Sequence, residues 1–418
     1  MDTYLITGGN KLKGEIELQG SKNSSLPIIA ASILIDGIVN ISKCPNISDT
    51  IAMQELLEIL GCKVINENGN LIIDSRTCDK DEIPEDLMKE IRSSIVFMGP
   101  MLAKHKRVVL TYPGGCEIGA RPIDLHLSGL IQLGARINET HGYIVCETDK
   151  LKGNEIDLDF PSVGATENIM LAAVLAEGNT IIRNVAREPE IIDLQNFLNK
   201  AGAKIEGAGS NVIKISGVKA LHDVEYTITG DRIVAGTYLC GAAITGGELL
   251  VKGVIPEYIR STLHKLKESG CQIKIYNKED ILLKAPERLR AINTIKTMPF
   301  PGFPTDMQSQ MVTMLSLAQG TSIVIENIFE NRYKYISELT KMGAKITIEG
   351  KTAVIKGVKK LMGATVEAKE LRGGASLVLA GLAAEGETKI NGIHYIERGY
   401  ENFVDNLQGI GAKIAKIK

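Results

Sequence analysis

Hydrophobic and polar positions follow two alternating patterns that recur along this chain. Segments with helical spacing of apolar residues, such as MQELLEIL (53–60) and IIDLQNFL (191–198), end at a glycine, where helices commonly stop. Runs in which apolar residues alternate with polar ones follow each glycine and predict strands. The glycine is the second residue of a short signature that occurs six times, as LGCKV, LGARI, AGAKI, SGCQI, MGAKI and IGAKI. Successive glycines lie 73, 68, 68, 73 and 68 residues apart, so we expect six copies of one structural unit.

A second helix in each unit is rich in small apolar residues, as in GATENIMLAAVLA and GASLVLAGLAA. The unit therefore consists of helix, strand, helix, strand and strand, which predicts an α/β or α+β fold. A solenoid is the alternative, because many repeat proteins are scaffolds with binding surfaces. A unit of about 70 residues is long for a solenoid. We expect two domains, because 418 residues exceed what one core usually serves.

The ends of the chain indicate where the domains divide. The last unit stops at AKIAKIK without the strand that follows in other units, and KLKGEIELQGSKN near the N-terminus supplies a similar strand. We therefore expect the N-terminal strand to complete the sixth unit. One domain would span 21–229 and the other 1–20 plus 230–418, with the active site in the cleft between them. Two crossings between domains would suit opening and closing of such a cleft.

Polar or charged residues stand at equivalent points where the six small-residue helices begin. They are Lys22, Arg92, Ser162, Asp231, Asp306 and Arg372. Helix N-termini attract anions, so these positions favour a substrate rich in phosphate or carboxylate. Ordinary N-capping is the alternative for the two aspartates and is favoured for Asp231. Capping does not explain the basic residues, because cations are disfavoured at a helix N-terminus.

Composition narrows the functional class. The net charge of −2 and the absence of Trp argue against a nucleic-acid binder. The first residues do not resemble a signal peptide, and the longest apolar run, 26–35, is too short to span a membrane. Seven cysteines without a C-x-x-C pair favour free thiols in a reducing cytoplasm. The six histidines are scattered, and we expect no protein-held metal.

The segment PGGCEIGARPIDLH (113–126) carries the strongest candidate for chemistry. Three glycines within it predict a loop, where functional groups concentrate. We expect Cys116 to be accessible, with Arg121 close enough to affect its pKa. The other cysteines are expected to serve packing, because Cys62 and Cys271 replace the repeat alanine and Cys240 lies in an apolar helix.

Motifs along the whole chain resemble those of the enolpyruvyl transferases, most closely the members that act on UDP-N-acetylglucosamine. The motifs are GSKNSSLP (20–27), RSSIVFMGP (92–100), the Cys116 segment, SVGAT (162–166), REPEI (187–191), FPTDMQ (303–308), ENR (330–332), LRGGASLVLAG (371–381) and ERGYE (397–401). The resemblance implies two inside-out α/β barrels of three units each, in agreement with the six repeats. Phe160 and Ser48 depart from the family, because some members have Lys at these positions.

The resemblance also implies a reaction, in which the enolpyruvyl group of phosphoenolpyruvate moves to the 3′-hydroxyl of UDP-N-acetylglucosamine and phosphate is released. This is the first committed step of peptidoglycan synthesis. Cys116 would be the general acid and Asp306 the general base. Lys22, Arg121 and Arg398 would hold phosphoenolpyruvate, with Asn23 near the reacting atoms. The diphosphate would be held by Arg92, Arg121, Pro122, Ile123, Asp124, Leu125, Ser162, Val163 and Gly164. Asp306 and Ile328 would hold the sugar, and Arg332, Arg372, Asp231 and Glu190 would complete the charged lining.

Three other functions are weighed against this one. A shikimate-phosphate enolpyruvyl transferase shares the repeats but lacks a PGGC loop. An RNA 3′-phosphate cyclase shares part of the unit, but the neutral charge disfavours it. A non-catalytic regulatory paralogue is disfavoured because Lys22, Cys116, Asp306 and Arg398 are all present. We expect a monomer without cofactor whose partners are the two small-molecule substrates.

Overall fold

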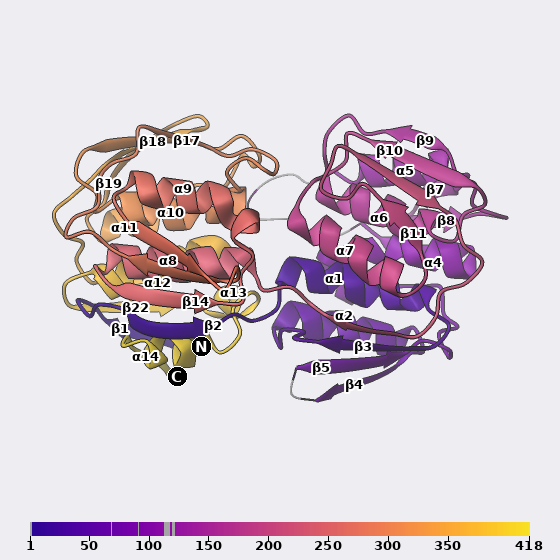
Figure 1. Cartoon of the computed structure of the whole chain (residues 1–418), viewed down its shortest axis with the longest axis horizontal. Coiled ribbons are helices and arrows are strands. Elements are labelled where there is room, and N and C mark those ends of the chain that lie inside the picture. The colour runs from indigo at the N-terminus through magenta and orange to yellow at the C-terminus, as the bar shows by residue number, and fades with distance from the viewer. Residues whose placement is uncertain (1, 68, 91, 113–117, 119–121) are drawn as a thin grey trace. The chain divides into compact units, whose positions relative to one another are not determined.

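The computed structural model describes residues 2–67, 69–90, 92–112, 118 and 122–418. The chain forms two compact units, each with its own hydrophobic core. We call Gly20–Cys116 with Arg121–Thr229 the first unit, and Met1–Gln19, Glu117–Ala120 and Gly230–Lys418 the second unit. Each unit is described by itself, and Figure 1 shows the elements of both.

In the part of the first unit that the structure describes there are three sheets. In order across each sheet they are β13 (Val224–Thr227), β3 (Ile38–Ser42), β5 (Asn70–Asp74) and β4 (Lys63–Glu67); β6 (Arg107–Thr111), β8 (Tyr143–Glu147) and β7 (Arg136–Thr140); and β11 (Lys204–Glu206), β12 (Val212–Ser216), β10 (Asn179–Arg183) and β9 (Glu155–Asp157).

Three sheets also belong to the second unit. They are β15 (Gln272–Tyr276), β16 (Asp280–Lys284), β14 (Glu248–Lys252) and β2 (Lys13–Glu17); β17 (Thr294–Lys296), β18 (Thr321–Ile325), β20 (Thr352–Lys356) and β19 (Lys345–Glu349); and β21 (Thr365–Glu367), β22 (Glu387–Asn391), β1 (Thr3–Thr7) and β23 (Lys413–Ile417). All five four-stranded sheets contain one parallel pair, with the remaining pairs antiparallel.

The small-residue helices lie inside the units. They are α1 (Lys22–Ala31), α4 (Met98–His105) after the 3-10 helix η2 (Arg92–Phe97), α6 (Val163–Ala173), α8 (Arg232–Ile244), α10 (Gln308–Leu315) after η4 (Thr305–Met307), and α12 (Leu371–Ala383). Every residue of α8 and α10 is buried. Because α8 is apolar on nearly all sides, it has no face to offer water. The buried glutamines of α10, Gln308 and Gln310, hydrogen-bond to Tyr335 and Thr237 within the unit. Figure 1 shows α8, α10 and α12 with strands around them. This is the inside-out arrangement that the family resemblance implied.

The second helix of each repeat ends just before the repeat glycine, as the sequence pattern predicted. These helices are α2 (Ser48–Ile59), α5 (Asp124–Gln132), α7 (Pro189–Lys200), α9 (Arg260–Glu268), α11 (Ile336–Lys341) and α14 (Phe403–Gly409). The six glycines have φ between +95° and +102°, a range that L-residues with a side chain rarely adopt. The remaining short helices are η1 (Ser32–Leu34), α3 (Glu85–Glu90), η3 (Pro256–Ile259) and α13 (His394–Glu397).

The strand pairing corrects one expectation. The strand within KLKGEIELQGSKN is β2, and it pairs in parallel with β14 of the fourth repeat, not with the sixth. The strand that completes the sixth repeat is β1, which pairs antiparallel with both β22 and β23. The physical reason is that β13, which directly precedes α8, pairs with β3 in the first unit. Because β13 is used there, β2 fills the vacant edge beside β14.

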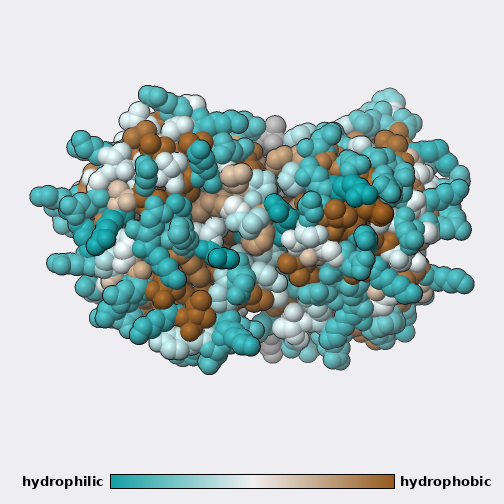
Figure 2. Space-filling view, turned by 45° about the horizontal axis from the view of Figure 1, so that its top comes forward, coloured by the Kyte–Doolittle hydropathy of each residue, from teal (hydrophilic) through white to brown (hydrophobic). Residues whose placement is uncertain are grey.

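Polar and charged residues cover most of the surface in Figure 2, with small hydrophobic patches between them. Among the described residues, no helix is long and apolar enough to cross a membrane.

Two glycine substitutions test the turn geometry of the repeat. Gly343 has φ +95° and nothing within 4 Å of an added Cβ, so Gly343→Ala tests backbone strain alone. We expect a loss of about 1–2 kcal/mol in the free energy of unfolding. Gly409 has equally open space but lies within α14. Gly409→Ala should gain about 0.5–1 kcal/mol, because alanine loses less entropy in a helix. Urea unfolding of both variants measures this, and effects of the same sign would contradict it.

Candidate active site

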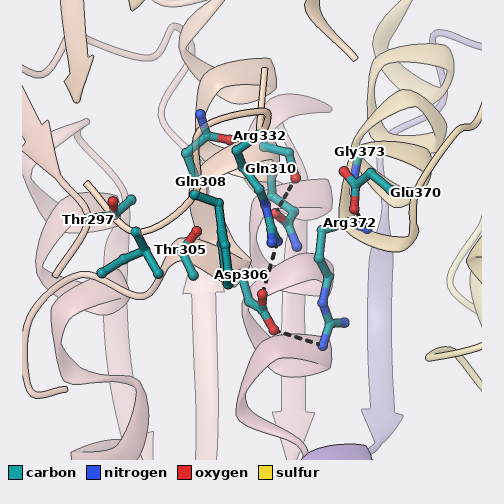
Figure 3. A network of polar contacts seen from close by, with 12 residues as sticks. Thr297, Thr305, Asp306, Gln308, Gln310, Arg332, Glu370, Arg372 and Gly373 are labelled. Atoms are coloured by element: carbon teal, nitrogen blue, oxygen red, sulfur yellow. Dashed lines mark hydrogen bonds and ion pairs between the residues drawn. The ribbon is translucent and has the colours of Figure 1, made fainter. Parts of the chain in front are cut away.

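A charged cluster in the second unit joins the fifth and sixth repeats. Asp306 lies in η4, just before the central helix α10, and two buried arginines reach it from other elements (Figure 3). Arg332 Nη2 lies 2.9 Å from Asp306 Oδ1, and Arg372 Nη2 lies 3.4 Å from Asp306 Oδ2. The arginine side chains are 1% and 3% exposed, whereas that of Asp306 is 28% exposed. The buried arginines therefore fix the position of the carboxylate, which stays partly exposed to solvent.

The two buried arginines of this cluster stay charged. Burial acts to lower the pKa of Arg332, but the carboxylates of Asp306 and Glu370 outweigh it, so the pKa is raised. Burial also acts to lower the pKa of Arg372, but Tyr400 and Asp306 outweigh it and raise the pKa above the ordinary value. Guanidinium groups of this kind bind carboxylate or phosphate through charge-assisted hydrogen bonds, as they bind Asp306 here.

Glu326 connects the turn that contains Asp306 to the segment after β18. It was not singled out from the sequence. Its side chain accepts hydrogen bonds from the hydroxyls of Thr297 and Thr305, at 2.8 and 3.0 Å. It also accepts from the backbone N–H groups of Ile328 and Phe329, at 2.8 and 3.2 Å. Glu326 is 1% exposed, and these four donors satisfy the buried charge. It thereby ties the segment containing Ile328 to the turn containing Asp306. Its place just after a strand of alternating apolar residues was the available signal.

Arg372 is oriented by a second polar chain that leads into the helical core. Its Nη1 donates to the Tyr400 hydroxyl at 3.3 Å, and that hydroxyl lies 2.9 Å from Thr237 Oγ1. Gln310 Nε2 donates to the same threonine oxygen at 3.1 Å. Tyr400 belongs to the ERGYE motif but was not singled out from the sequence. Arg398, in the same motif, is half-buried at the end of α13.

The acidic residues at the helix starts fall into two groups, those that cap the helix and those that pair with other side chains. Asp231 Oδ1 accepts from the N–H groups of Ile233 and Val234 at 2.8 and 3.0 Å, so the favoured capping interpretation is confirmed. Glu370 caps α12 by accepting from Arg372 N at 2.8 Å and from Gly373 N. Asp306 differs from these two acids, because its carboxylate oxygens pair with the arginine side chains.

In the first unit, Lys22 opens α1 and forms an ion pair with Asp49. Lys22 Nζ lies 2.7 Å from Asp49 Oδ2, and the two side chains are 12% and 3% exposed. Ser21 caps the helix by accepting from Ser24 N at 3.3 Å. The buried aspartate orients the ammonium group, and Asn23 follows it on the same helical turn.

The starts of α5 and α6 lie together in the first unit. Ser162 caps α6 by accepting from Ala165 N at 3.4 Å, and Gly164 packs on the His126 ring, which a Cβ would meet at 3.0 Å. His126 Nδ1 lies 2.7 Å from Asn168 Nδ2, and Asn168 also bonds Gly99 N at 2.8 Å. This places Val163 and Gly164 near the segment Pro122–Leu125, with the second and third repeats connected through one buried asparagine. Sequence reasoning did not single out His126 or Asn168.

Glu167, in α6, is affected by two other carboxylates of the first unit. Burial raises the pKa of Glu167 well above its ordinary value, and the nearby charges of Glu190 and Glu188 raise it further. Glu190, expected in the charged lining, is 4% exposed in the first turn of α7.

Three expectations fall outside the described residues or side chains. Cys116 and Arg121 are not among the described residues, and for Arg92 only the backbone, at the start of η2, is described. Ile118 is described: it is buried, and its carbonyl accepts a hydrogen bond from Asn331 N at 3.0 Å within the second unit.

Solved structures share the fold over the whole chain. The enolpyruvyl transferase NikO from Streptomyces tendae matches with a TM-score of 0.88 at 24% identity, over 99% of this chain and 98% of that one. EPSP synthase from Acinetobacter baumannii matches with a TM-score of 0.78 at 20% identity, over the full length of both. The architecture is therefore that of the enolpyruvyl transferases.

The sequence comparisons go further than the fold. The family model described as EPSP synthase (3-phosphoshikimate 1-carboxyvinyltransferase) matches residues 6–407, and the chain belongs to this family. A relative from Caldanaerobacter subterraneus subsp. tengcongensis, named UDP-N-acetylglucosamine 1-carboxyvinyltransferase 2, is 54% identical over the full length of both chains. One from Symbiobacterium thermophilum, named UDP-N-acetylglucosamine 1-carboxyvinyltransferase 1, is 51% identical over 100% of this chain and 95% of its own.

The raised pKa of Glu167 predicts a pH-dependent stability. A carboxyl group whose pKa is raised by folding stabilises the protein below its unfolded pKa, and this stability is lost as pH rises toward the folded pKa. Glu167→Gln should therefore be more stable than the parent protein at pH 8, with a smaller difference at pH 5. Urea midpoints at both pH values measure this, with exposed Glu225→Gln in the same unit as control. A difference independent of pH would exclude the mechanism.

Proposed function

We propose that this protein transfers the enolpyruvyl group of phosphoenolpyruvate to the 3′-hydroxyl of UDP-N-acetylglucosamine and releases phosphate, as the first committed step of peptidoglycan synthesis. The observation that carries the proposal is the partly exposed Asp306 carboxylate, fixed by Arg332 and Arg372 at 2.9 and 3.4 Å. It stands in a chain that is 47–54% identical to full-length relatives named for this transfer. Residues of both units would serve this one reaction.

Asp306 is the proposed general base. Its exposed oxygen can accept the proton of the sugar hydroxyl, while the buried arginines fix the carboxylate in position. The proton acceptor and the hydroxyl must lie within hydrogen-bond reach, so the orientation set by Arg332 and Arg372 supports this role. Glu326 contributes by holding Thr305, the neighbour of Asp306.

Lys22, Arg121 and Arg398 are the proposed ligands of phosphoenolpyruvate. The orientation of Lys22 by Asp49 supports its part, because a fixed ammonium group binds an anion with less loss of side-chain entropy. Arg92, Pro122–Leu125 and Ser162–Gly164 are the proposed diphosphate ligands. The contact between Gly164 and His126, which joins the starts of α5 and α6, supports a shared site there.

Cys116 is the proposed general acid, which protonates C3 of phosphoenolpyruvate so that C2 can be attacked by the sugar oxygen. The contact between Ile118 and Asn331 supports this assignment, because Asn331 directly precedes Arg332 of the charged cluster.

Transfer to shikimate 3-phosphate is the alternative. The family model carries the name of that reaction, but the solved EPSP synthase is only 20% identical and supports the fold alone. The full-length relatives near 50% identity favour the nucleotide sugar. We also propose that the protein acts in the cytoplasm and is a monomer. Sedimentation at the mass of one chain would support the monomer, and sedimentation at a multiple of that mass would refute it.

Asp306→Asn should remove the base while keeping a hydrogen-bond acceptor for Arg332. We expect kcat to fall by about 10²–10⁴-fold, with a much smaller change in the KM for UDP-N-acetylglucosamine. Exposed Asp405→Asn in the same unit is the charge-matched control and should leave kcat unchanged. Unfolding midpoints must show that both variants fold. Turnover near that of the parent protein would remove Asp306 from the base role.

Substitutions of Cys116 should separate acidity from nucleophilicity. Cys116→Asp keeps a proton donor but lacks the sulfur, so it should remain active with a pH optimum moved toward acid. It should resist alkylation by a phosphonate epoxide such as fosfomycin. Cys116→Ser should turn over very slowly, because a hydroxyl is a weak acid. Rates of all three forms across pH, with and without the epoxide, give the test. Activity of Cys116→Ala equal to that of the parent protein would refute the general-acid role.

A further inference from the structure

One backbone contact recurs in all six repeats and allows positions to be compared within the chain. The carbonyl preceding each repeat glycine accepts a hydrogen bond at 2.8–3.2 Å from a residue near the end of the repeat. The donors are Lys13, Asp79, Lys152, His222, Arg290 and Met362. This bond fixes two further positions, the residue after the glycine and the residue before the donor, on neighbouring segments of the same repeat.

The two positions are normally a small residue and a leucine. The position after the glycine is Ala135, Ala203, Ala344 or Ala412 in four repeats and Cys62 or Cys271 in the other two. The position before the donor is Leu12, Leu151, Leu221, Leu289 or Leu361 in five repeats, all buried. In the first repeat it is Cys78. Leucine at this position is sufficient for packing. The first repeat is the one repeat with cysteine both after the glycine and before the donor.

The two cysteines lie on neighbouring segments, and one of them contacts a histidine. Thr77 Oγ1 donates to Gly61 O at 2.6 Å, and Asp79 N donates to Leu60 O at 3.2 Å, so the residues on both sides of Cys78 are bonded to the two residues that precede Cys62. Each cysteine is close enough to the other to shift its pKa. His105, at the end of α4, places Nε2 at 3.4 Å from Cys78 Sγ.

These contacts favour the thiolate form of Cys78. The neighbouring Cys62 lowers the pKa of Cys78, and although burial opposes this, His105 and Lys104 lower the pKa further. Cys271 occupies in the fourth repeat the position of Cys62, but that repeat has Leu289 at the position of Cys78, and burial raises the pKa of Cys271 to about 11. Since the thiolate is the reactive form of cysteine, Cys78 should react faster than Cys271.

We propose that Cys62 and Cys78 form a dithiol pair that a small peroxide oxidises to a disulfide. The Cys78 thiolate attacks one oxygen of hydrogen peroxide, the O–O bond breaks, and Cys78 becomes a sulfenic acid as hydroxide leaves. The Cys62 sulfur then attacks Cys78 Sγ, the S–O bond breaks, and water leaves as the disulfide forms. Two thiols are oxidised, one peroxide is reduced to water, and no other reactant is required.

The oxidant must be small, because Cys62 and Cys78 are only 6% and 8% exposed. A bulky disulfide such as oxidised glutathione cannot reach the sulfur without local opening. The product would close the segment from Cys62 to Cys78, which contains the hairpin of β4 and β5. Its function would be independent of the proposed transfer reaction.

The test is to treat the full chain with hydrogen peroxide, trap remaining thiols with N-ethylmaleimide, and map all cysteines by mass spectrometry without reduction. We expect a linked Cys62–Cys78 peptide that is two hydrogens lighter and is released by dithiothreitol, while Cys271 stays reduced. His105→Gln should slow its formation by about tenfold, because the thiolate loses a stabilising partner.

Cys78→Leu restores the residue found in the other five repeats and should fold normally while leaving Cys62 as a free thiol. Three outcomes would overturn the proposal: both thiols recovered free under conditions that oxidise Cys271, Cys78 converted to sulfinic acid with Cys62 unmodified, or equal rates of disulfide formation with and without His105.

Discussion

The burial of helices that are apolar on every side is the constraint on which this structure depends. A helix such as α8, buried along its whole length, cannot lie on the outside of a sheet with one face in water. It must be enclosed, and the contacts among α8, α10 and α12 show how three repeats in the second unit do this together. Each sheet then needs only one apolar face, which accounts for the alternating burial along strands such as β18. In the second unit, each of these three helices packs against the other two.

The same constraint determines where polar groups can gather. Enclosed helices have buried backbone along their length, and their first turns are where unpaired N–H groups remain. Ser21, Ser162, Asp231 and Glu370 satisfy these groups as caps. Lys22 and Arg372 lie immediately inside their helices and are paired with Asp49 and Asp306. Desolvation of these charges is offset only by such partners, so each of these buried cations comes with an acid or hydroxyl beside it.

Sequence periodicity was sufficient to predict the repeats, because a glycine with positive φ leaves a local signal at every helix end. It was insufficient to pair the strands. β1 and β2 have similar alternation, and their assignment depends on β13 being used in the first unit, which is a tertiary effect. The charged candidate residues were singled out through motifs, whereas Glu326, Tyr400 and Asn168 were not singled out. Their roles come from partners far away in sequence, as in the pairing of Glu326 with Thr297. Cys62 was interpreted as a packing residue because its proximity to Cys78 is visible only in three dimensions.

The acceptor substrate is the central claim, because the fold is shared with relatives that carry other names. The most direct measurement is phosphate release from phosphoenolpyruvate by the purified full chain, with UDP-N-acetylglucosamine or shikimate 3-phosphate as acceptor. We predict stoichiometric release that requires UDP-N-acetylglucosamine and does not occur with shikimate 3-phosphate. Release with shikimate 3-phosphate and none with the nucleotide sugar would contradict this assignment.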